Sequence, residues 1–184
     1  MSILRFAVSG IPRPAPRPRA DGKGVHKSPD ADEWMALVRL AALAELGLQG
    51  DVGPAGGSPI FLSTKLRREL PLFLGPVSLG LEFCRPKKGV MHGAAYPHEQ
   101  VPDLDNLVKA VKDALGNWGH RGAIVWHDDG QVARYHRCGK SWVHPDNAGV
   151  WIEVRPARRR SVPVIPPAAP GATGFAGRRL PRTR

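Results

Sequence analysis

The chain is poor in cysteine, in aromatic residues and in long apolar runs. Its 184 residues include two cysteines, Cys84 and Cys138, and 7% aromatic residues. Two cysteines without a CxxC pair exclude a disulfide framework and a cysteine-based zinc site, so we expect both thiols to be reduced. No stretch of about 18 apolar residues occurs, so we expect no membrane span. Residues 1–5 lack the apolar region of a secretory signal, and we expect a cytoplasmic protein.

The signatures of nucleotide and zinc chemistry are also missing. The chain has no GxxxxGK[ST] loop and no Rossmann glycine pattern, which argues against a nucleotide cofactor. Its seven histidines form no HxH or HExxH pattern, so a zinc hydrolase has little support.

Acidic residues are scarce, and their scarcity makes their positions informative. Sixteen Asp and Glu face 27 Lys and Arg, which gives a net charge of +11. Residues 155–184 hold eight arginines and no acidic residue, so this segment carries +8. Such basicity favours a polyanionic partner through counterion release, although a solubilising tail remains an alternative. Residues 156–184 are rich in Arg, Pro, Ala and Gly, and we expect a disordered basic tail after a domain at 1–155.

Hydrophobic periodicity predicts the elements of that domain. Strands are expected at 4–8, 77–83, 123–126, 131–138 and 150–154, and helices at 30–46 and from 103 to 115. Residues 47–75 are rich in Gly and Pro and are expected to form a loop insertion, and 85–100 a basic mobile loop. This order predicts a single α/β (α+β) domain with a mixed β-sheet and two main helices packed on it.

Carboxylates gather at two places in this otherwise basic chain. Asp103 and Asp105 stand at the start of the second helix, with Lys109 one turn after Asp105, and Asp128-Asp129 follows a short apolar run. If the helix packs beside that run, the two groups converge on one site. Oxygen ligands of this kind suit Mg²⁺, which can activate water and neutralise charge on a phosphoryl group. A nearby lysine would stabilise developing negative charge.

Each group also has a plain structural interpretation. Asp103 is suited to an N-cap, Asp105 and Lys109 to an exposed i,i+4 ion pair, and Asp128-Asp129-Gly130 to a turn between strands. The metal-site hypothesis requires Asp103 and Asp105 to meet Asp129 in space.

At these residues the chain resembles the RusA-type Holliday junction resolvases, endodeoxyribonucleases of bacteria and their phages. The matching motifs are DLDN at 103–106 with Lys109, DAL at 113–115, and DDxQV at 128–132. A Gly-Ile-Pro segment at 10–12 and an Arg-Pro-Arg segment at 17–19 also resemble the start of family members. The likeness covers roughly residues 3–155, whereas the long 47–75 insertion and the basic tail depart from the pattern.

The resemblance implies a homodimeric nuclease that needs Mg²⁺, or Mn²⁺, and makes paired nicks in four-way DNA junctions during recombination and repair. It implies that Asp103, Asp105 and Asp129 bind the metal, with Asp128 as the adjacent carboxylate and Lys109 as the functional lysine.

The candidate phosphate contacts share a basic side chain in an extended or looped segment. They are Arg13, Arg17, Arg19, Lys87 and Lys88. Such contacts would position branched DNA without reading its sequence, although a solvated proline-rich leader explains the arginines equally well. Two other functions stay open: a non-catalytic DNA-binding recombination accessory, and a broader nuclease acting on flaps or forks.

Overall fold

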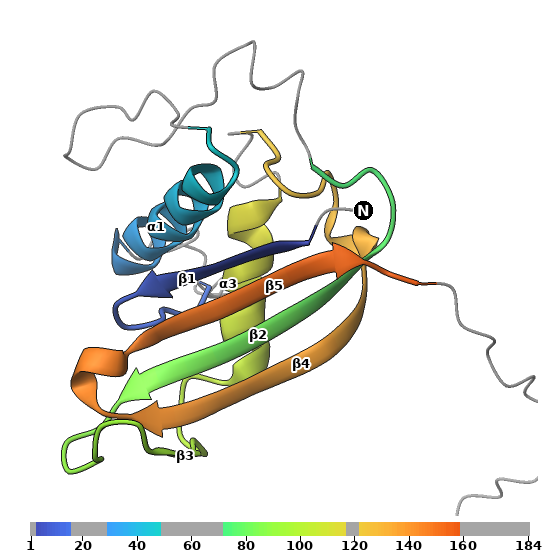
Figure 1. Cartoon of the computed structure of the whole chain (residues 1–184). Coiled ribbons are helices and arrows are strands. Elements are labelled where there is room, and N and C mark those ends of the chain that lie inside the picture. The colour runs from blue at the N-terminus through green and yellow to red at the C-terminus, as the bar shows by residue number, and fades with distance from the viewer. Residues whose placement is uncertain (1–2, 16–28, 49–71, 117–121, 159–184) are drawn as a thin grey trace, which may run out of the picture.

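The computed structural model of the protein describes residues 3–15, 29–48, 72–116 and 122–158 (Figure 1). These residues form a five-stranded sheet with the strand order β1-β5-β2-β4-β3. The strands are β1 (Leu4–Ser9), β2 (Val77–Pro86), β3 (Ala95–Pro97), β4 (Val132–Val143) and β5 (Gly149–Pro156). The helices are α1 (Pro29–Glu45) and α3 (Leu104–Leu115), and short 3₁₀ turns lie at Asp129–Gln131 and Pro145–Asn147.

The sheet is mixed because one pair of neighbouring strands is parallel. β5 runs antiparallel to both β1 and β2, whereas β2 and β4 run parallel. A parallel pair needs a crossover that returns the chain to the same end of the sheet. The connection from β2 to β4 contains β3 and then α3. The chain then enters β4 through the 3₁₀ turn at Asp129–Gln131.

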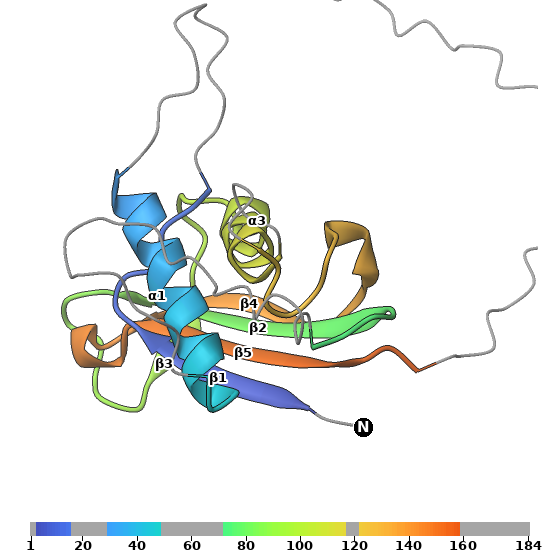
Figure 2. The ribbon, with the colours of Figure 1, turned by 90° about the horizontal axis from the view of Figure 1, so that it is seen from above.

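The helices pack against the sheet through apolar faces. Buried residues of α3 recur every three or four positions, as an amphipathic helix requires. Figure 2 shows α3 on one side of β2, β4 and β5, and α1 contacts both α3 and β1. α1 starts at Pro29, whose fixed φ suits a first helical position, with Asp30 and Asp32 in the first turn. No helix in the described ranges has the length and hydropathy to cross a membrane.

A buried arginine locks the two helices together. Arg39 of α1 is 0% exposed. Its guanidinium donates to the carbonyl of Ala114 at 2.8 Å and to that of Gly122 at 2.9 Å. The carbonyls at a helix C-terminus have no intrahelical donors and carry partial negative charge. Arg39 therefore satisfies the end of α3 and fixes where the chain leaves it.

The opposite face of the sheet carries polar side chains, and no described helix covers it in Figure 1. In β1 the burial alternates strictly, with Leu4, Phe6 and Val8 buried and the residues between them exposed. We call this side the open face. Its charged and polar members on the four long strands include Arg5, Ser78, Glu82, Arg134, His136, Arg137, Ser141, Glu153 and Arg155.

Most of the predicted elements are confirmed, including the mixed sheet with two helices. Two predictions are wrong. Residues 124–126 are fully buried but form no strand. Ile124 and Val125 donate their N–H groups to the carbonyl of Leu115, and their own carbonyls accept from Leu72 and Phe73. The predicted mobile loop at 85–100 also contains structure, because β2 extends to Pro86 and Ala95–Pro97 pairs with β4 as β3. Residues 49–71 of the expected insertion and 159–184 of the expected tail lie outside the described residues.

Candidate active site

A cleft of about 600 Å³ lies between α3 and β4. We call it the acidic cleft. Its lining residues are Leu104, Asp105, Val108, Lys109, Lys112, Asp129, Tyr135 and Cys138. Asp105, Lys109 and Lys112 are spaced i, i+4 and i+7, so they share one face of the helix. Asp129 comes from the turn before β4, and the crossover thus brings Asp105 and Asp129 to one cleft.

Asp103 stands just before α3, at its N-cap, with extended backbone (φ −64°, ψ 147°). Its side chain makes no capping hydrogen bond, and it does not line the acidic cleft. Lys140 of β4 fixes the approach to this position. Its Nζ donates to the carbonyl of Gln100 at 2.7 Å and to that of Pro102 at 2.9 Å. Lys140 therefore fixes the backbone that immediately precedes Asp103.

The Asp128-Asp129 turn is shaped by Gln131, whose role the sequence did not reveal. The Gln131 amide donates to the carbonyls of Phe73 and Gly75, both at 3.1 Å, and its oxygen accepts from the N–H of His127 at 2.8 Å. The Asp128 carboxylate accepts from the N–H of Gly130 at 2.7 Å, which completes a capping box. Asp128 thus stabilises the turn, and the turn presents Asp129 to the cleft.

The two lysines of the cleft pair with different carboxylates. Lys109 contacts Asp113 at 2.9 Å, so the predicted alternative of an Asp105–Lys109 ion pair is not formed. Lys112, which belongs to none of the recognised motifs, contacts Asp129 at 3.3 Å. Asp105 and Lys112 are seven residues apart, or about 10 Å along a helix. Lys109 and Lys112 both line the cleft, so two positive side chains share it with Asp105 and Asp129.

Tyr135 forms the β4 wall of the acidic cleft. Burial raises the pKa of its phenol, and the nearby Cys138 and Asp129 raise it further. The phenol is therefore neutral at physiological pH and offers a hydrogen bond rather than a charge. Although its side chain is partly buried, Tyr135 as a whole remains 48% exposed. It is well placed to contact a ligand that enters the cleft.

Hard oxygen ligands such as Asp105 and Asp129 are the type that Mg²⁺ prefers, so the donor chemistry of the cleft fits this ion. Among the described residues, however, the ligand atoms of Asp103, Asp105 and Asp129 do not form a group within 4.8 Å of one another. Such a group does form from His92, His144 and Asp146. His144 and Asp146 follow the end of β4, whereas Asp129 precedes its start, and 12 residues of strand span roughly 40 Å. The histidine group is therefore remote from the acidic cleft.

Three of the predicted DNA contacts can be placed. Arg13 pairs with Asp30 at 3.4 Å, and its segment reaches α3 through a hydrogen bond from the Ala15 N–H to the Asn106 carbonyl. Lys87 and Lys88 follow the end of β2, where Lys87 lies 5.4 Å from the ring centre of Trp142. Arg17 and Arg19 lie outside the described residues. Arg13 is therefore the predicted contact that the structure ties to the start of α3.

Comparison with known proteins gives the chain a family. The family model described as Endodeoxyribonuclease RusA matches residues 61–155, which include the whole acidic cleft. This chain belongs to the RusA family. The "Uncharacterized protein YqaN" of Bacillus subtilis (strain 168) is 29% identical to it over 140 residues, 72% of this chain and 83% of YqaN. The RusA match supports endodeoxyribonuclease activity and a Holliday junction as the family substrate.

Proposed function

We propose that this protein is a magnesium-dependent endodeoxyribonuclease that resolves four-way DNA junctions by paired nicks, in recombination and repair. The observation that carries the proposal is the acidic cleft, where Asp105, Lys109 and Asp129 from both RusA motifs line one space. The family match supplies the reaction class. Asp105 and Asp129 are 24 positions apart and line the same cleft. A helix cap and a turn, taken as separate structural features, would not need to meet in this way.

Asp105 and Asp129, together with Asp103 at the helix start, are the residues that would hold the ion. Bound Mg²⁺, or Mn²⁺, supplies an activated water and neutralises charge on the scissile phosphate. Asp128 is the adjacent carboxylate in the motif, and its hydrogen bond to Gly130 assigns it to shaping the turn. This division would leave three carboxylates for the ion, in keeping with the few that Mg²⁺ usually takes from a protein.

The cleft's own cations have distinct tasks. Lys109 is 57% exposed and oriented by Asp113, so it can approach a phosphate oxygen and offset its charge. Lys112 is 20% exposed and holds the Asp129 carboxylate in the cleft. Leu104 and Val108 make one wall apolar, which strengthens electrostatic interactions in the cleft. Arg13, Lys87 and Lys88, which do not line the cleft, would bind the DNA backbone outside it.

A four-way junction offers two equivalent strands, and a symmetric dimer with one cleft per subunit matches that symmetry. We therefore expect a homodimer whose two subunits cut the opposed strands. Analytical ultracentrifugation of the full chain tests this part alone, and a monomer at working concentration would contradict it.

Cleavage of a labelled synthetic four-way junction tests the proposal. With Mg²⁺ we expect paired symmetric nicks, which Asp105→Asn lowers by a factor of at least about 100 because a ligand and its charge are lost. Asp146→Asn removes the same charge far from the cleft and should cut normally. Junction left intact by the wild-type protein, or nicked equally by Asp105→Asn, would refute the proposal. Parallel rates on a flap, a fork and a plain duplex decide whether the junction is preferred.

A further inference from the structure

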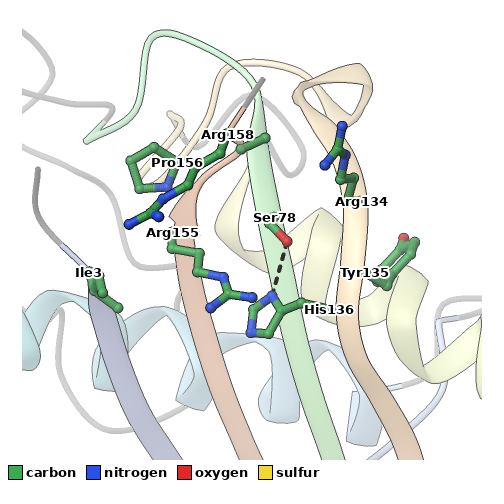
Figure 3. A pocket seen from close by; sticks show the side chains of 9 residues that line it. Ile3, Ser78, Arg134, Tyr135, His136, Arg155, Pro156 and Arg158 are labelled. Carbon is green, nitrogen blue, oxygen red and sulfur yellow. Dashed lines mark hydrogen bonds between the residues drawn. The ribbon is translucent and has the colours of Figure 1, made fainter. Parts of the chain in front are cut away.

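The open face holds a second cavity, of about 670 Å³, at the end where β5 leaves the sheet (Figure 3). We call it the arginine cavity. Three arginines and no acidic residue line it, from β4, from β5 and from the segment that follows β5. The lining residues are Ile3, Ser78, Arg134, Tyr135, His136, Arg155, Pro156, Ala157 and Arg158. The space is open to solvent on the side of the sheet that carries no helix.

A buried carboxylate outside the cavity contacts two of the residues that line it. Glu153 is 7% exposed and accepts a hydrogen bond from Arg5 Nε at 3.0 Å. Its carboxylate also lies 3.4 Å from His136 Nε2 and 3.8 Å from Arg155. A buried carboxylate is costly unless it is paired, so Glu153 fixes the positions of its neighbours. Within the described residues neither Arg134 nor Arg158 forms an ion pair, and both charges are left for a ligand.

The backbone is shaped to admit His136 into the sheet. Leu79 pairs with Tyr135 but Gly80 pairs with Arg137, so His136 is an extra residue of β4, a bulge. A Cβ on Gly80 would lie 2.5 Å from His136 Nε2, so only glycine leaves room for the ring. Ser78 Oγ holds the other ring nitrogen at 3.0 Å, as the dashed line in Figure 3 shows. Ser78 is 6% exposed, so this bond orients the ring rather than preparing a nucleophile.

His136 adds hydrogen bonding to the cavity and little charge. Burial lowers its pKa, and Arg155 lowers it further, while Glu153 acts in the opposite direction. The ring is therefore neutral at physiological pH. The positive charge of the cavity comes from its arginines, whose guanidinium groups match the paired oxygens of a phosphate.

We propose that the arginine cavity binds phosphate groups of the DNA backbone, as a second contact next to the strand that enters the acidic cleft. Tyr135 lines both cavities, so they adjoin across β4. Residues 132–140 of β4 have no outer strand neighbour within the described part, because β3 pairs only with Ser141–Val143. A DNA strand can therefore pass over this edge from one cavity to the other. The proposal rests on the proposed function for the choice of DNA, and it assigns Arg134, Arg155 and Arg158 to positioning without base reading.

Binding of a fluorescent four-way junction to the full chain without metal tests this site separately from cleavage. Arg134→Gln and Arg158→Gln should each weaken binding about 3- to 10-fold at about 0.1 M salt and lower the slope of log K against log salt by about 0.9. Arg137→Gln is the matched control. It lies on the same strand and face, pairs with Glu82 at 3.2 Å and does not line the cavity, so its effect should stay below about twofold.

Affinities and salt slopes of both variants equal to those of the wild type, or no lower than those of Arg137→Gln, would overturn the proposal. Competition with a polyglutamate peptide separates the ligand classes: a peptide that binds more tightly than DNA, with its binding lost in Arg134→Gln, would also overturn it in favour of an acidic protein partner. A wild-type chain that binds junctions but does not nick them with Mg²⁺ refutes the nuclease proposal alone. A wild-type chain that does not bind junctions refutes both.

Discussion

The two faces of one sheet differ in how they treat charge. On the helix side, the side chains of β2 and β5 are apolar and buried, and the charged groups include Arg39, which donates to backbone carbonyls at the end of α3, and those of the acidic cleft beside β4. On the open face, Glu153 lies among three cationic or titratable neighbours within the sheet itself. Alternation along a strand makes this division possible, because successive side chains point to opposite faces. The helix side therefore carries the apolar core and the acidic cleft, whereas the open face carries the arginine cavity.

Removing the lock on the helix side should have the largest effect on stability. Arg39→Met leaves the buried carbonyl of Ala114 and the partly buried carbonyl of Gly122 without this donor. We expect the free energy of unfolding to fall by about 2 to 4 kcal/mol, as measured by urea denaturation. Arg39→Lys keeps the charge but not the forked geometry of the guanidinium. Its free energy of unfolding should lie between that of Arg39→Met and that of the wild type. Equal stability of Arg39→Met and the wild type would show that the α1–α3 contact does not depend on this residue.

On the open face, a substitution at Gly80 should have the next largest effect on stability. Gly80→Ala pushes a methyl group into the His136 ring, so we expect a loss of about 1 to 3 kcal/mol in unfolding free energy. The same change in a His136→Ala background should cost almost nothing, because the clash is gone and alanine suits a strand better than glycine. This double-mutant cycle isolates the contact. An equal cost in both backgrounds would place the role of Gly80 elsewhere.

Acidification should have the smallest of these effects on stability, and it should act through His98 and His136. Burial, reinforced by Lys140, lowers the pKa of His98 in the segment from β3 to α3, and burial with Arg155 lowers that of His136. A histidine whose folded pKa lies below its unfolded value of about 6.5 binds a proton more readily in the unfolded chain. Its contribution is therefore complete above that pH and is lost as the pH falls below it.

Urea midpoints from about pH 8 to about pH 5 measure this loss. His98→Gln and His136→Gln should each make the decline shallower, and the larger change identifies the more sensitive region. A midpoint that stays constant down to about pH 5 in the wild type would contradict the expected loss on both sides.

The difference between what could and could not be predicted follows the range of the interactions. Alternation in Leu4, Phe6 and Val8 and the apolar stripe of α3 are local patterns, and both elements were predicted with bounds close to those observed. The strand predicted at 123–126 failed for the opposite reason. Its apolar residues are buried by α3 and by Leu72 and Phe73, so complete burial produced a strand-like run without a strand.

The sequence by itself determined the candidate chemistry: two carboxylates at a helix start, a second pair before a strand, and a basic chain around them. Only the tertiary structure decided which groups meet. The crossover through α3 brings Asp105 and Asp129 to one cleft, where Lys112 pairs with Asp129 and Asp105 does not pair with Lys109. The pairing of strands in the sheet assembles the arginine cavity from three strands and the segment after β5, because it joins residues that are distant in sequence. Local spacing predicts elements and motifs, whereas contacts between distant segments depend on the packing of the whole domain.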